Sequence, residues 1–396
     1  MLLGLLCLPL LLNAQGLGEQ AARARADSND AQLNYQVARG FWEQKNWDEA
    51  EYYLRQAIAV APQYAEALLA MSQLPAVRGE GYWKRYESAK GRAATDSALN
   101  RYAEYGRRAF LVNPLVDLAI LGDVEVSEYL TFGTYNFRNV TFRVWWIKPW
   151  RRAATLLHHG NAAAAYAALD TLVHDKQFGG NPNQVPNIVV WYHGMSAARL
   201  KDWDTAIADF AVLTGRGVQR EKDIAAESSL PPSPLRLPLE RYPTNDYRYG
   251  LGTMLFLAGR YHQAAPVFKR VLEIDLSMFP AHVQLARMLE AQGDWAGAVA
   301  EREAAIAAFP EDATLHMELA VTLLRAGRLD DAIGAMNEAM RVNPRDYRLP
   351  LLLGEMLVSA GRPREARAQY ERFLAMAPLR LTDQIGQVRQ TLAQIQ

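Results

Sequence analysis

The chain has 396 residues, of which 50% are hydrophobic, and its 43 lysine and arginine residues balance 43 aspartate and glutamate residues. The hydrophobic content excludes an intrinsically disordered chain, and the formal net charge of zero gives no overall positive field of the kind that attracts nucleic acid, so we expect no nucleic-acid partner. A chain of this length is long for one compact core, but an array of repeats avoids that limit because each repeat contacts only its neighbours.

The chain begins with a segment, residues 1–15, that is predicted to be a secretory signal peptide. Its first twelve residues, MLLGLLCLPLLL, are almost wholly apolar, and the expected cleavage point follows at Ala14 or Gln15. The apolar run is too short to span a bilayer, so we expect no integral membrane span once it is removed. No lysine or arginine precedes Arg23, which leaves the alternative of an apolar first helix packed on the array. The favoured interpretation is an exported protein, either periplasmic or at the cell surface.

The only cysteine, Cys7, lies inside this apolar segment. The residue before it is Leu6, whereas bacterial lipoprotein signals have a small residue at that point, so a lipid anchor at Cys7 is not expected. Without residues 1–15 the chain would contain no thiol, and therefore no disulfide and no thiolate metal site.

Residues 31–114 are predicted to form N-terminal helical repeats with one insertion. The first pair of helices spans 31–64, and a second unit begins near Leu68 and ends near Pro114. Between these limits the charged stretch 72–106 is longer than a standard repeat allows, and we expect it to be helical with an inserted turn.

Residues 115–150 are predicted to be an irregular, aromatic-rich segment. Near 130–146, apolar Val140, Phe142 and Val144 alternate with polar residues, which is the period of a strand and favours a short extended or β segment. We expect the aromatic side chains to fill the space between adjacent repeats, and the alternative is an aromatic platform for a peptide or a sugar. The aromatic residues concerned are Phe132, Tyr135, Phe137, Phe142, Trp145, Trp146 and Trp150.

The middle of the chain, residues 151–215, is predicted to hold further helical repeats. Residues 216–244 follow, and their five prolines predict a loop or linker rather than a helix. This linker separates the C-terminal part from the rest, either as a joint that bends or as a strap that lies on the surface.

Residues 245–378 contain the most regular pattern in the chain. Four glycines stand 34 residues apart, and each is followed five residues later by an alanine and preceded seven residues earlier by a glycine or alanine. A fixed period of this length is typical of stacked helical hairpins, in which the glycine ends the first helix and the small residues let two helices cross closely. Residues 379–396 are expected to form a capping helix over the last repeat. The four glycines are Gly259, Gly293, Gly327 and Gly361.

The pattern resembles that of the tetratricopeptide repeat family. The family's frame has a large residue, a leucine and a small residue in the first helix, then a glycine, an aromatic residue, an alanine and a final proline. Besides 245–378 the frame recurs at 31–64 and 187–215, and it is broken at Leu276 in place of a proline and at Arg302 in place of an aromatic residue. The resemblance implies an all-α fold, a right-handed superhelical solenoid of antiparallel helix pairs. Outside the C-terminal array the resemblance is carried by Ala38, Trp47, Ala50, Pro62, Gly194, Trp203, Ala206 and Phe210.

In that family the first helices of successive repeats line a concave groove that binds a partner. The resemblance therefore implies a protein or peptide partner that contacts matching positions of these helices. Clamping of a carboxylate terminus is not expected, because no Asn accompanies Arg287 and Arg325 at the groove positions. The groove residues implied are Tyr35, Arg39 and Trp42 in the N-terminal copy, Trp191 and Arg199 in the middle copy, and Tyr249, Phe256, Arg287, Glu290, Met317, Arg325 and Glu355 in the C-terminal array.

Motifs of catalysis and cofactor binding are absent from the sequence. It has no Walker loop, no dinucleotide glycine fingerprint and no HExxH motif. His282 and His316 occupy matching repeat positions and are expected to be half-buried structural residues rather than metal ligands. We therefore predict no catalytic residue, no metal and no cofactor. The sequence predicts an exported, non-enzymatic scaffold for envelope assembly, secretion or a surface complex. The alternative is a glycan-binding repeat protein or an enzyme subunit with a site in 125–150, and the oligomeric state stays open.

Overall fold

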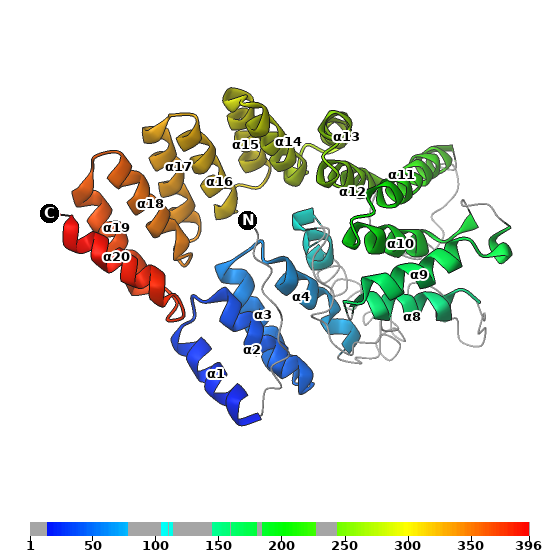
Figure 1. Ribbon diagram of the computed structural model, residues 1–396, viewed down its shortest axis with the longest axis horizontal. Helices are drawn as coiled ribbons and strands as arrows, with labels where there is room; N and C mark the ends of the chain where they lie inside the picture. The colour runs from blue at the N-terminus through cyan, green and yellow to red at the C-terminus, as the bar shows by residue number, and fades with distance from the viewer. Residues whose placement is uncertain are drawn as a thin grey trace.

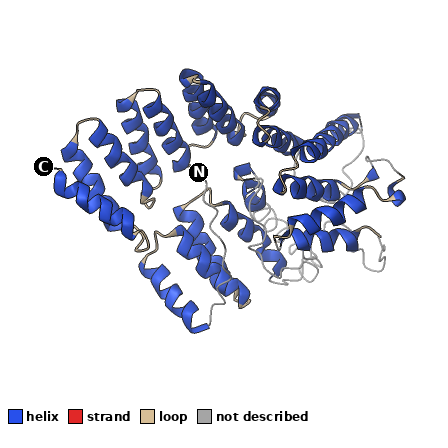
Figure 2. Ribbon diagram, in the orientation of Figure 1, coloured by secondary structure: helices blue, strands red, loops and turns tan. Residues whose placement is uncertain are grey.

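The computed structural model describes residues 14–77, 104–109, 111–113, 145–158, 160–179, 184–226 and 244–395. In these ranges every regular element is a helix and no strand occurs (Figure 2). The all-α prediction is therefore confirmed. Most of the extended segment expected near 130–146, most of the insertion at 72–106 and residues 1–13 of the expected signal peptide lie outside the described residues.

The helices follow one another as antiparallel pairs, and consecutive pairs stack into a curved solenoid (Figure 1). The N-terminal helices are α1 (Ala14–Ala26), α2 (Ala31–Glu43), α3 (Trp47–Val60) and α4 (Ala65–Val77). The middle helices are α8 (Ile147–His158), α9 (Ala162–Val173), the short 3-10 helix η2 (Lys176–Phe178), α10 (Asn187–Arg199) and α11 (Trp203–Ala226). The C-terminal array comprises α12 (Thr244–Leu257), α13 (Tyr261–Ile274), α14 (Phe279–Gln292), α15 (Trp295–Ala308), α16 (Ala313–Arg325), α17 (Leu329–Val342), α18 (Arg348–Ser359), α19 (Pro363–Met376) and the capping helix α20 (Thr382–Gln394).

The turns inside the repeats follow the predicted pattern in the C-terminal array. The four periodic glycines adopt left-handed backbone with φ of 68° to 78°, a conformation that glycine takes at no steric cost. The corresponding turn between α8 and α9 also carries a glycine, Gly160 at φ 77°, whereas the turns of α2–α3 and α10–α11 carry Lys45 at φ 58° and Lys201 at φ 62°. The turn geometry is therefore common to the repeats, while the residue that occupies it is not.

The small residues before these turns allow the two helices of a pair to pack closely. A Cβ atom at Gly252 would lie 2.7 Å from the ring of Phe268, and one at Gly354 would lie 2.6 Å from the ring of Tyr370. Contacts this short do not occur, so only glycine fits while the rings keep their places. The alanines after the turns are fully buried, namely Ala264, Ala298, Ala332 and Ala366.

The N-terminal helices close the solenoid on itself. Helices α1 to α4 lie along the inner side of the arc that runs from α8 to α20, and α20 comes back beside α1 (Figure 1). The backbone N–H of Leu379 donates to Asp27 Oδ2 over 3.1 Å, and Asn343 Nδ2 donates to the backbone oxygen of Val60 over 2.8 Å. We call this contact the seam. It joins loops 27–30 and 60–64 to loops 309–314, 343–348 and 377–381 of the C-terminal array.

The two sides of the seam have separate hydrophobic cores. Helices α1 to α4 share one buried cluster, and α15 to α20 share another. Among the described buried residues, neither cluster includes a residue from the other side. The seam is therefore held mainly by polar contacts between loops, which contribute less to stability than the repeat cores do.

Helix α1 belongs to the folded N-terminal unit. Leu17, Ala21 and Ala24 are buried, and Leu17 lies against Gly40 so closely that a Cβ atom there would clash with it. The hydroxyl of Tyr53 donates to the backbone oxygen of Ala21 over 3.3 Å. Within the described ranges, no helix combines the length and the apolar character that crossing a bilayer requires.

The structure differs from the predicted linker at its N-terminal end. Helix α11 continues to Ala226, whereas a loop was expected from residue 216. No proline interrupts 216–226, and the first proline of the expected linker is Pro231, so nothing in this stretch ends the helix. The remaining linker residues, 227–243, lie outside the described residues.

Candidate functional site

Three of the predicted groove residues lie in the core instead of on a surface. Tyr249 is fully buried, and its hydroxyl donates a hydrogen bond to the backbone oxygen of Leu111, 2.7 Å away. Tyr35 and Trp42 are buried in the core of α1 to α4, where Tyr35 packs against Tyr64 with ring centroids 5.1 Å apart. Because neighbouring repeats cover these side chains, they have no surface to offer a partner, and the prediction of groove contacts at these three positions is corrected.

Two further groove residues, Arg287 and Glu290, are tied into an ionic network. The buried guanidinium of Arg302 on α15 donates to Glu290 Oε1 over 3.1 Å and also to Glu318. Arg287 pairs with Glu318 at 3.1 Å, and the Thr322 hydroxyl donates to Glu290 Oε1 over 2.6 Å. A buried guanidinium requires carboxylate partners, so Arg302 replaces the expected aromatic residue only because both glutamates are present.

The remaining predicted residues keep contact with solvent. Arg325 and Glu355 are exposed, and partial burial raises the pKa of the Glu355 carboxyl. Beside them, Leu324 of α16 is 38% exposed and Val358 of α18, at the matching position one repeat later, is 43% exposed. We call Met317, Leu324, Arg325, Glu355 and Val358 the C-terminal groove. The half-buried predicted residues are Arg39, Trp191, Arg199, Phe256 and Met317.

The described tryptophans of the aromatic-rich segment pack inside the fold. Trp150 and Trp146 are buried in the largest hydrophobic cluster, and Trp145 packs against Phe178 with ring centroids 4.7 Å apart. These three side chains fill space between helices as expected, and they do not form an exposed platform for a sugar. The other aromatic residues of the segment lie outside the described residues.

The two histidines that share a repeat position make local contacts. His282 Nδ1 lies 2.7 Å from Glu301 Oε2, and His316 Nε2 lies 3.1 Å from the backbone oxygen of Pro310. In the part of the chain that the structure describes, no three His, Cys, Asp or Glu side chains gather in a way that could hold a metal ion.

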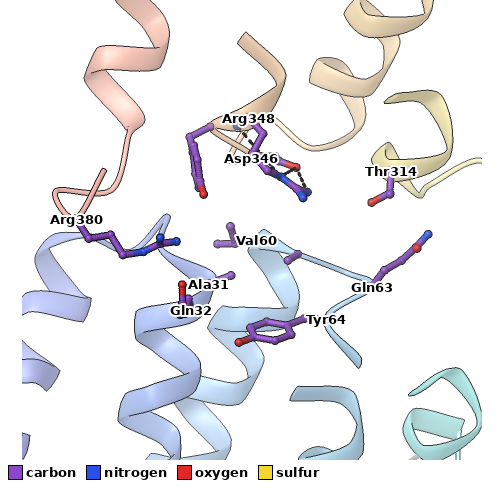
Figure 3. Close-up of a pocket in the computed structure, with 11 residues that line it drawn as sticks. Ala31, Gln32, Val60, Gln63, Tyr64, Thr314, Asp346, Arg348 and Arg380 are labelled. Atoms are coloured by element: carbon purple, nitrogen blue, oxygen red, sulfur yellow. Dashed lines mark hydrogen bonds and ion pairs between the residues drawn. The ribbon is translucent and has the colours of Figure 1, made fainter. Parts of the chain in front are cut away.

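A cavity of about 440 Å³ opens at the seam (Figure 3). Arg348 lies on its upper wall, where it forks onto Asp346 through contacts of 2.6 and 2.9 Å, and Arg380 reaches in from the side while its Nε donates to Asp30 over 2.7 Å. We call this cavity the seam pocket. Its lining residues are Ala31, Gln32, Val60, Ala61, Gln63, Tyr64, Thr314, Asp346, Tyr347, Arg348 and Arg380.

Sequence reasoning missed the seam pocket because its arginines lie where repeats are joined, Arg348 as the first residue of α18 and Arg380 in the loop before α20. The repeat frame assigns contacts to the first helices and treats loops 343–348 and 377–381 as links. A signal was nevertheless present, since each of these loops carries an arginine that the frame does not require.

Comparison with models of known families matches a tetratricopeptide repeat at residues 283–346 and again at residues 323–395. The chain is a tetratricopeptide repeat protein. A search of curated proteins found no match to it.

Three solved structures illustrate what this tetratricopeptide repeat protein is similar to. The APC/C hetero-tetramer Cut9–Hcn1 is 13% identical, with 92% of this chain and 76% of that chain covered and a TM-score of 0.38. A thermophilic tetratricopeptide repeat protein of Thermus thermophilus is 18% identical, with coverage of 62% and 98% and a TM-score of 0.26. MamA from Desulfovibrio magneticus RS-1 is 18% identical, with coverage of 58% and 93% and a TM-score of 0.28.

Membership of the family supports a protein-interaction scaffold. Proteins built from tetratricopeptide repeats bind protein partners and are typically non-catalytic. Within this protein, the C-terminal groove presents exposed side chains of the first helices α16 and α18, and the seam pocket is a cavity lined by residues from both sides of the seam.

Proposed function

We propose that this tetratricopeptide repeat protein is an exported scaffold that binds a protein or peptide partner in its C-terminal groove. The observation that carries the proposal is the exposure of Leu324 and Val358 at matching positions of successive first helices, beside the exposed Arg325 and Glu355. Apolar side chains next to charged ones of both signs are typical of the surfaces that recognise proteins.

The chemistry of the groove indicates how such a partner binds. An apolar side chain of the partner packs against Leu324 and Val358, whose exposed area then leaves water. A basic group of the partner lies at Glu355, because partial burial already disfavours the unpaired charge of that carboxylate and a cation compensates for it. An acidic group of the partner pairs with the guanidinium of Arg325.

Export is the second element of the proposal, and it rests on the apolar run MLLGLLCLPLLL at the start of the chain. The scaffold serves envelope assembly, secretion or a complex at the cell surface. The scaffold acts by holding its partner and performs no chemistry of its own.

Capture by the immobilised full chain tests the groove. The double substitution Leu324→Ser and Val358→Ser is expected to lower partner recovery by about tenfold or more, since truncation of a central apolar contact costs over 1 kcal/mol. A matched control is Ile274→Ser with Leu276→Ser, because these side chains are 45% and 73% exposed but lie at the end of a second helix, outside the groove. Equal recovery by both double variants would exclude the C-terminal groove as the site.

Cell fractionation tests export separately. The full chain is expected in the exported fraction, and a chain without residues 2–15 is expected to stay in the cytoplasm. If both chains are found in the cytoplasm, the protein is not exported, whatever the groove binds.

A further inference from the structure

We propose that the seam pocket is a second binding site, which takes the carboxylates of an acidic peptide segment and holds the seam closed when it is occupied. It goes beyond the proposed function because the pocket lies at the helix ends and loops that meet across the seam, and its lining does not include Leu324 or Val358. The pocket volume of about 440 Å³ lies in the range of small-molecule and peptide sites.

The carboxylates at and beside the pocket are already paired with donors of the protein. Asp30 caps α2 by accepting from the backbone N–H groups of Gln32 and Leu33, and its other oxygen accepts from Arg380. Asp346 accepts from the backbone N–H and from the guanidinium of Arg348. Both residues are buried, at 1% and 4% exposure, and each carboxylate is paired with an arginine of the pocket.

Asp312 lies beside the pocket and contacts one of its lining residues, Gln63. It is 1% exposed, caps α16 by accepting from the backbone N–H of Thr314, and accepts from Gln63 Nε2 over 2.8 Å. The three buried carboxylates therefore cap helices and fix the orientation of the donor side chains Arg348, Arg380 and Gln63.

Several side chains that remain accessible in the pocket carry hydrogen-bond donors. The side chains of Arg348 and Arg380 are 45% and 43% exposed, and their aspartate partners fix the direction in which each guanidinium points. The amide of Gln32 is exposed at the same opening. The Tyr64 phenol, whose pKa is raised by burial, is a further O–H group in the pocket lining.

An excess of oriented donors around a cavity selects a ligand that accepts hydrogen bonds and carries negative charge. Guanidinium groups bind carboxylates through paired, charge-assisted hydrogen bonds, and the rings of Tyr64 and Tyr347 provide apolar walls for the chain between two carboxylates. A segment with closely spaced aspartate or glutamate residues meets these demands, and a partner protein can supply it.

The position of the pocket gives its occupancy a mechanical consequence. Tyr64 and Gln32 come from the N-terminal side of the seam, whereas Arg348 and Arg380 come from the C-terminal array (Figure 3). No buried hydrophobic cluster of the described residues joins α1 to α4 with α15 to α20, so mainly polar contacts resist opening at this point. A ligand that bonds to both sides binds only the closed form and increases its population.

Titration of the full chain with defined probes tests the site. The probes are a short acetylated peptide of alternating aspartate and alanine, the same peptide with lysine in place of aspartate, citrate, and inorganic phosphate. We expect the aspartate peptide to bind, and the double variant Arg348→Gln with Arg380→Gln to bind it at least about tenfold more weakly, since hydrogen bonds to charged groups are being removed. Arg328→Gln is the matched control, because Arg328 is also an exposed arginine paired with an aspartate, Asp331 at 2.7 Å, but lies outside the pocket.

Several outcomes overturn the proposal. They are no binding of the aspartate peptide, equal binding by the double variant, equal binding of the lysine peptide, and arginine-dependent binding of citrate or phosphate alone, which would indicate a small-anion site. Circular dichroism first checks that the double variant is folded. If it is not, Arg348→Lys with Arg380→Lys and, separately, Gln32→Leu are used, and each is expected to weaken peptide binding by a smaller factor. The substitutions Leu324→Ser and Val358→Ser should leave this binding unchanged, so failure of the groove and failure of the seam pocket are distinguishable.

Discussion

The N-terminal repeat formed by α2 and α3 and the C-terminal repeats share one frame but use it for opposite purposes. Trp42, Leu324 and Val358 all stand three residues before the turn of their repeat. Trp42 is 8% exposed and packs against Trp47, with ring centroids 5.4 Å apart, whereas the other two are 38% and 43% exposed. The frame thus sets where a side chain stands on its helix, and the neighbouring elements decide whether that position is core or surface.

The same two regions differ at the turn itself. The C-terminal repeats have glycine in the left-handed position, whereas the repeats α2–α3 and α10–α11 have Lys45 and Lys201 there at φ 58° and 62°. A non-glycine residue in this conformation costs about 1 kcal/mol. The turns of the C-terminal array therefore cost less conformational free energy. The same array nevertheless contains the ionic network of Arg302 at a position where other repeats have an apolar side chain.

The largest expected effect comes from a substitution that breaks the ionic network of Arg302. Arg302→Ala leaves Glu290 and Glu318 without their guanidinium in a largely buried place, and we expect a loss of about 4 kcal/mol in the free energy of unfolding. Urea denaturation measures the loss in the free energy of unfolding, and hydrogen exchange measures the effect within α14 to α16. A triple variant, Arg302→Met with Glu290→Gln and Glu318→Gln, is expected to recover most of the loss. A triple variant as unstable as Arg302→Ala would show that shape rather than charge holds these helices together.

A second effect concerns the contact between an N-terminal repeat and α12. Arg107 Nε and Nη2 donate to the carboxylate of Asp246 over 2.8 and 3.0 Å, and that carboxylate is fully buried. Arg107→Ala leaves the charge buried without its partner, and we expect a loss of about 3 kcal/mol at neutral pH.

The pH dependence of this variant identifies the cause. Burial raises the pKa of Asp246 above its unfolded value even with Arg107 present, and removal of Arg107 raises it further. The favourable contribution of protonated Asp246 is fully present below the unfolded pKa of about 4 and is lost as the pH rises through the folded pKa. The difference between Arg107→Ala and the unaltered chain should therefore be largest near neutral pH and shrink under acidic conditions. A difference that is independent of pH would mean that packing, not charge, was lost.

Individual residues show which features of the structure could be predicted from the sequence. Gly327 and its periodic relatives predicted where helices end, because the required backbone conformation depends on the residue itself. The burial of Tyr249 was not predictable, because its hydroxyl donates to Leu111, 138 residues away in the chain. The seam pocket was also not predictable, since Asp30 and Arg380 are 350 residues apart in the chain. Local periodicity thus encodes the repeat, while closure of the array depends on loops that the repeat leaves variable.

A third effect, of opposite sign in the two regions, tests the comparison of turns. Gly327→Ala is expected to lose about 1 kcal/mol, because φ of 77° is unfavourable for a residue with a Cβ atom. Lys45→Gly and Lys201→Gly are each expected to gain up to about 1 kcal/mol, reduced by the greater freedom of glycine in the unfolded chain. No side chain or backbone atom lies within 4 Å of a Cβ built at Gly327, so a clash does not contribute. Thermal and urea unfolding measure all three variants, and a gain from Gly327→Ala would contradict the account.

The smallest change in free energy is expected at the seam, where the change in shape is the more sensitive measurement. Arg345 donates to the backbone oxygen of Ser28 over 2.8 Å and to Asn29 Oδ1 over 3.2 Å, near the surface. The variant Arg345→Ala should lower the free energy of unfolding by less than about 1 kcal/mol, because water can replace the lost hydrogen bonds there. Its radius of gyration in solution scattering should nevertheless increase, because no shared apolar cluster of the described residues holds α1 to α4 against α15 to α20. The control, Arg341→Ala with Arg328→Ala, removes two exposed pairs from α17 and should leave the radius unchanged. An unchanged radius in the seam variant, even after Asn343→Ala is added, would mean that closure does not depend on these polar contacts.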